Sequence, residues 1–85
     1  MFGILYLHMT PEQTKLISDL AADLKPMVKD IEAGIPTTQN NYGRYGSLIS
    51  QLSKGDKRVG AIIALALIEA GANRVGVQNA LKLFV

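Results

Sequence analysis

The polar side chains near the C-terminal end of the chain are the ones whose types and spacing could do chemistry. Arg74, Gln78 and Lys82 recur every four residues, and Asn79 stands next to Gln78. In a helix this spacing puts the three on one side, opposite an apolar face. Cationic groups bind phosphates, and amide groups hydrogen-bond to base edges. The pattern predicts a nucleic-acid-binding surface, to which three further cations are assigned: Lys57, Arg58 and Arg44.

Other kinds of chemistry lack the residues they need. The chain has no Cys and a single His, His8, so thiolate sites, histidine metal sites and Ser–His–acid triads are all incomplete. Residues 55–60 have the glycine spacing of a phosphate-binding loop, but Ala61 and Ile62 stand where its Lys and Ser/Thr belong. We therefore expect no enzyme activity, no cofactor and no metal.

Charge is unevenly distributed in this chain of net charge +2. Residues 1–39 hold three Lys against five acids, and residues 40–85 hold six Lys and Arg against two acids. A basic half favours a polyanionic partner such as DNA, or self-association in which unlike halves meet. The acids of the first half alternate with lysines, which is typical of a solvated helix face.

The length of 85 residues and the hydrophobic fraction of 48% predict one domain spanning residues 1–85. The longest charge-free apolar run, residues 59–68, is about half of what a membrane span needs, so we expect no membrane contact. The absence of Cys fits a reducing compartment, and the expected localisation is the cytoplasm. Small, cysteine-free chains of this kind suit a phage or mobile element.

Four helices are predicted to position the candidate residues, giving an all-α fold, a small four-helix bundle. Thr10-Pro11-Glu12-Gln13 supplies an N-cap, a proline at the first helical position and a capping box. Apolar residues then recur at helical spacing as far as Ile31. Pro26 lies inside this pattern and should kink or break the first helix near residues 24–25.

The remaining helices follow a loop at residues 35–41. The second runs from about Tyr42 to Leu52, the third from 57 to 70, and the last is opened by Asn73 as its N-cap. The third helix is apolar on every side, which predicts a buried central helix.

Residues 63–82 resemble the helix-turn-helix of DNA-binding proteins. A helix, a tight turn and a second helix follow in that order, with Gly71 in the turn and the β-branched Val77 six positions later. Such units usually have Ala four residues before the glycine, where this chain has Leu67. The resemblance implies that the second helix enters the major groove of DNA. The structural alternative is a plain corner of the bundle, with Arg74 and Lys82 in water.

Two tyrosines and a cation alternate with glycines at the start of the second helix. Tyr42 and Tyr45 could stack on bases while Arg44 contacts a phosphate. Alternatively, both rings lie at the edge of the core with their hydroxyls in water, and Arg44 lies over a ring. Because the tyrosines share a face with Ile49 and Leu52, the spacing favours the second interpretation.

The apolar surface exceeds what so short a chain can cover. Three helices barely surround the third one, and residues 1–8 add Phe2, Ile4, Leu5 and Leu7. We expect a homo-oligomer in which the first helix or an apolar N-terminal arm contacts a second subunit. Residues 1–8 are either a short strand or an apolar arm that packs on the body or on a neighbouring subunit, or an upstream extension of a reading frame that starts at Met9.

Two functions are compatible with the sequence. The first is a small DNA-binding or regulatory protein that uses the last helix. The second is a homo-oligomeric interaction or inhibitor module with a protein partner and no role in nucleic-acid binding. In that case Arg74, Gln78 and Lys82 are solvated or lie in a subunit interface.

Overall fold

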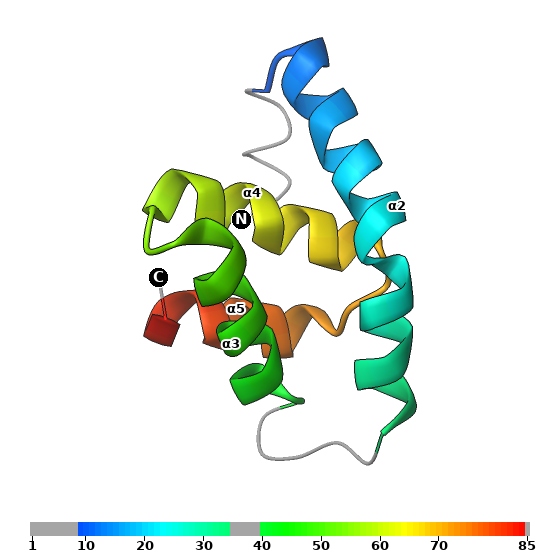
Figure 1. The fold of residues 1–85 in the computed structure, drawn as a ribbon, viewed down its shortest axis with the longest axis vertical. Coiled ribbons are helices and arrows are strands. Elements are labelled where there is room, and N and C mark those ends of the chain that lie inside the picture. The colour runs from blue at the N-terminus through cyan, green and yellow to red at the C-terminus, as the bar shows by residue number, and fades with distance from the viewer. Residues whose placement is uncertain (1–8, 35–39, 85) are drawn as a thin grey trace.

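The structure is a computed structural model that describes residues 9–34 and 40–84. Within these ranges the chain forms four helices and no strand (Figure 1), in the order α2 (Pro11–Ala33), α3 (Tyr42–Ser53), α4 (Lys57–Glu69) and α5 (Arg74–Phe84). The predicted all-α four-helix bundle is confirmed. The predicted N-terminal arm and most of the predicted loop fall outside the described residues.

α2 begins at the predicted capping box. The Gln13 backbone N–H donates to the Thr10 hydroxyl at 3.1 Å, and the Gln13 side chain accepts from the Thr10 backbone N–H at 2.9 Å. Pro11 occupies the first helical position, where a missing N–H costs nothing. The local sequence therefore fixes where the first helix begins.

Pro26 bends α2 and does not break it. The helix is continuous from end to end, and Figure 1 shows its axis changing direction midway. Leu24 and Val28, one on each side of the proline, are buried at 5% and 2% exposure. Their burial offsets the roughly 3 kcal/mol that an interior proline costs. Pro26 and Ala22, whose carbonyl loses its partner, are both exposed, so water can reach that carbonyl.

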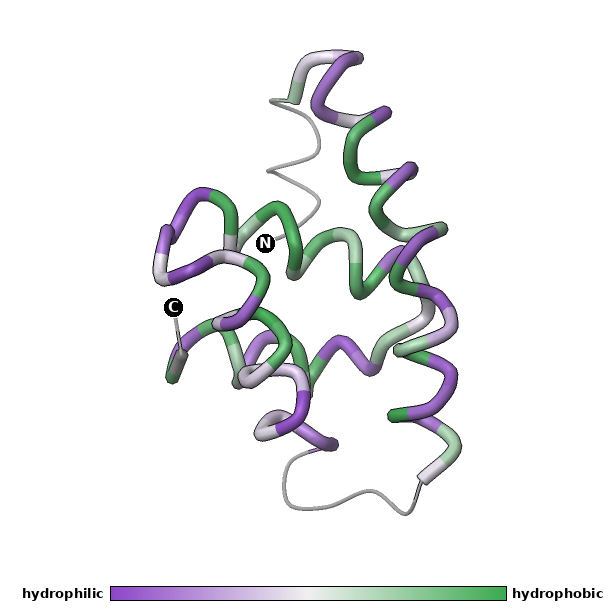
Figure 2. Tube along the Cα trace, in the orientation of Figure 1, coloured by the Kyte–Doolittle hydropathy of each residue, from purple (hydrophilic) through white to green (hydrophobic). Residues whose placement is uncertain are grey.

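The core lies where α4 packs between α2 on one side and α3 and α5 on the other. Hydrophobic residues occur along all four helices and are most continuous along α4 (Figure 2). The largest fully buried side chains come from every helix: Ile17, Val28, Tyr45, Ile49, Leu67 and Val77. One continuous core therefore holds the described part of the chain together.

α4 is the central helix, but it is not covered on every side. Ile63 and Leu67 are buried at 4% and 0% exposure, as its composition predicts. Val59 is 39% exposed and Ile62 is half-buried. The prediction that α4 is enclosed all round is therefore wrong at its first two turns, because only α2 flanks that side. Among the described residues, no helix is both long enough and apolar enough to cross a bilayer.

Candidate nucleic-acid interface

The predicted turn between the last two helices is present and regular. Gly71 has φ +106° and donates its N–H to the Ile68 carbonyl, while the Ala72 N–H reaches back to the Leu67 carbonyl at 2.9 Å. This pair of bonds is the Schellman motif, which needs a residue in the left-handed region at Gly71. Asn73 immediately precedes α5, and its side-chain oxygen accepts the Gly76 N–H at 3.1 Å, as an N-cap does. Both the turn glycine and the N-cap are as predicted.

The helices around this turn form a three-helix unit. α4 and α5 run in opposite directions, and α3 packs against both of them (Figure 1). Leu67, which stands where an alanine is usual in such units, is fully buried in the core. Val77 is also fully buried. α4 and α5 are therefore packed as one body with α3.

A carboxylate fixes the start of α5 to two other helices. The Glu32 Oε2 atom, near the end of α2, accepts a hydrogen bond from the Asn73 N–H at 3.1 Å. The same oxygen accepts a short hydrogen bond from the Tyr45 hydroxyl of α3. This junction, which we call the Glu32 clasp (Glu32, Tyr45 and Asn73), sets the direction in which α5 leaves the turn.

Tyr45 is a buried part of this clasp. Its side chain has no exposed surface. Burial, the hydrogen bond to Glu32 and the charge of that carboxylate raise the pKa of Tyr45 well above its ordinary value. Stacking of Tyr45 on a base is therefore excluded, and the expectation that its hydroxyl lies in water is wrong as well. Tyr42 is half-buried.

The predicted polar stripe lies on the outer side of α5. Arg74 and Lys82 are exposed, and Gln78 and Asn79 are half-buried. Val77 and Ala80, on the other side of the helix, are fully buried. The stripe therefore faces away from the core along the length of α5.

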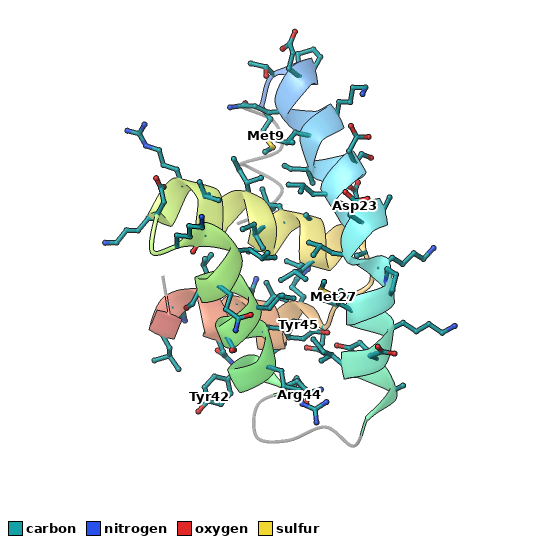
Figure 3. All side chains as sticks on the ribbon, in the orientation of Figure 1. Met9, Asp23, Met27, Tyr42, Arg44 and Tyr45 are labelled. Atoms are coloured by element: carbon teal, nitrogen blue, oxygen red, sulfur yellow. The ribbon has the colours of Figure 1, made fainter. Side chains whose placement is uncertain are left out.

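The other predicted cations divide into two places. Lys57 and Arg58 are exposed at the start of α4, which lies on the same side of the molecule as the end of α5 that carries Lys82 (Figure 1). Arg44 is exposed but lies toward α2, in a hollow that it shares with Met27 and Asp30 (Figure 3). The structure thus brings Lys57 and Arg58 to the α5 end and leaves Arg44 apart.

Sequence reasoning missed Glu32 as a positioning residue. Thirteen positions separate it from Tyr45 and 41 from Asn73, so no local spacing links the three. In the described ranges, no group of three His, Cys, Asp or Glu side chains could hold a metal ion. The chain matches no protein-family model, no curated protein and no solved structure.

Proposed function

We propose that this protein binds double-stranded DNA through the outer face of α5. The observation that carries the proposal is the placement of Arg74, Gln78 and Lys82 on the solvent side of a helix whose opposite side is fully buried. Eleven helical residues span about 16 Å, and the major groove, about 12 Å wide, admits a helix of this kind. Cations on the helix contact phosphates, and the amide of Gln78 reads base edges.

The charge distribution supports the same orientation. Five of the seven acids lie on α2, which packs mainly against α4, and one of them, Glu32, meets the start of α5. Lys57 extends the cationic surface beyond Lys82. A duplex that approaches α5 therefore meets attraction, and one that approaches α2 meets repulsion.

The junction at the start of α5 supports the role of a reading helix. Base recognition requires a helix held at a fixed angle to the rest of the domain. The Glu32 clasp and the turn at Gly71 hold the N-terminal end of α5 against α2, α3 and α4. The protein thus presents the first residues of α5 on a rigid support.

The double variant Arg74→Ala/Lys82→Ala tests this proposal. It should weaken binding to duplexes of any sequence by at least about tenfold and reduce the slope of log K against log salt by about 2, since each lost phosphate contact removes about 0.9. Fluorescence anisotropy with a labelled duplex measures both quantities.

The matched control is Lys25→Ala/Lys29→Ala, which removes the same charge from exposed positions on α2. It should leave both the affinity and the slope nearly unchanged. If the two double variants lose affinity equally, attraction is by net charge and α5 is not the binding face. If the unmodified protein does not bind DNA, the interaction-module alternative is favoured.

A further inference from the structure

An apolar groove lies open between α2 and the start of α4. Its volume is about 420 Å³. Leu16 and Met27 on one wall are each 47% exposed, and Leu52 and Val59 on the other are 44% and 39% exposed. These are four of the six large hydrophobic side chains that are exposed among the described residues. Apolar side chains gathered in one groove are typical of a contact surface.

One edge of this groove is acidic. Asp23, on α2, lines the groove itself (Figure 3). Asp19 and Glu12 lie four and eleven residues before Asp23, which places them on the same side of the helix. Asp19 forms an exposed ion pair with Lys15 at 3.2 Å, an arrangement that contributes little and is easily exchanged. We call Glu12, Asp19 and Asp23 the acidic rim.

The opposite edge is basic. Lys54, Lys57 and Arg58 lie in or next to the turn from α3 to α4, between the groove residues Leu52 and Val59, and all three are exposed. The one acid in this turn, Asp56, caps α4 by accepting the Arg58 and Val59 N–H groups at 2.9 and 3.2 Å. We call Lys54 and Arg58 the basic rim.

From this arrangement we infer that the groove is the interface of a homodimer. A two-fold axis along the groove places each acidic rim opposite the basic rim of the other copy and brings the apolar walls together. Asp23 of each copy then faces Arg58 of the other. The interface is self-complementary in charge, and the inference does not depend on DNA binding.

The charge pattern selects a second copy over other occupants. A partner of one charge sign would meet repulsion at one of the two rims. Residues 1–8 of the chain contain no Asp, Glu, Lys or Arg, so this segment offers no carboxylate, ammonium or guanidinium side chain to either rim. The groove residues of α2 run from Leu16 to Met27, about 17 Å of helix, so the groove forms the centre of the contact and the two rims extend it.

Sedimentation equilibrium of the full chain, without DNA, tests the inference. We expect a mass of twice 9.2 kDa at micromolar concentration. Leu16→Glu should raise the dimer dissociation constant at least about tenfold, because it puts a charge among the apolar walls. The matched control is Leu83→Glu on α5, which changes an exposed leucine outside the groove and should leave the constant unaltered. A monomer at high micromolar concentration, or equal effects of the two variants, would overturn the inference.

A charge exchange tests the pairing of the rims independently of the apolar walls. Asp23→Lys and Arg58→Glu should each weaken the dimer about fivefold, because each places like charges opposite one another. The double variant restores opposite charges and should return the dissociation constant to within about twofold of the original. Circular dichroism confirms that each variant is folded. Additive weakening in the double variant would contradict the proposed pairing.

Discussion

Gly76→Ala should lower the free energy of unfolding by about 3 kcal/mol, which is a large fraction of the stability of a domain this small. Gly76 is buried in α5, and a Cβ atom at this position would overlap the backbone carbonyl of Asn40. Asn40 immediately precedes Asn41, which is the N-cap of α3, and both residues have positive φ. A backbone carbonyl cannot rotate aside as the end of a flexible side chain can. α5 and the start of α3 must therefore separate to make room for the Cβ atom. Urea unfolding measures the resulting loss of stability.

Gly43→Ala is the matched control, with the opposite expected sign. Gly43 lies in α3, is exposed, and has no neighbour within 4 Å of an added Cβ. Alanine is favoured over glycine in helices, so stability should rise by about 0.5 kcal/mol. If Gly76→Ala is also stabilising, α5 does not approach the Asn40 backbone closely at Gly76.

Glu32→Ala should lower the free energy of unfolding by about 2 kcal/mol. The substitution removes the acceptor of the buried Tyr45 hydroxyl and of the Asn73 N–H. A buried donor left without an acceptor costs about 1–3 kcal/mol. Because Asn73 is half-buried, water compensates part of the loss at that position. Glu32→Gln retains one acceptor oxygen and should cost about half as much.

A double-mutant cycle isolates the contribution of the Tyr45 hydroxyl. In a Tyr45→Phe background, Glu32→Ala should cost about 1 kcal/mol less, because no hydroxyl is left without a partner. The pH dependence of stability is a second readout. Because the pKa of Tyr45 is raised in the folded protein, the unfolded chain loses the Tyr45 hydroxyl proton at a lower pH. The free energy of unfolding should therefore fall as the pH rises above about 10. Equal costs in both backgrounds would show that the clasp is not formed.

The features that could be predicted from the sequence are those fixed within a few neighbouring residues. The capping box at Thr10, the N-cap at Asp56 and the Schellman turn at Gly71 each depend on a short segment. Burial of Ile63 and Leu67 follows from helical periodicity. The outward direction of the Arg74 stripe follows from the same periodicity, because its opposite side is apolar.

The features that could not be predicted depend on segments far apart in the chain. The close approach of Gly76 to Asn40 gives Gly76 its role, and no local pattern in the sequence marks that approach. The Glu32 clasp joins three helices and leaves no local pattern. At Pro26 the outcome depends on the burial of flanking side chains, which the local rule for proline does not include.

Salt-dependent binding of the unmodified protein to a random-sequence duplex tests the DNA-binding role of α5 most directly. Contacts from Arg74, Lys82 and Lys57 predict a slope of log K against log salt of about −2.7, so affinity should fall about 40-fold between 50 and 200 mM salt. Absence of binding at 50 mM salt, or a slope near zero, would contradict the proposed function.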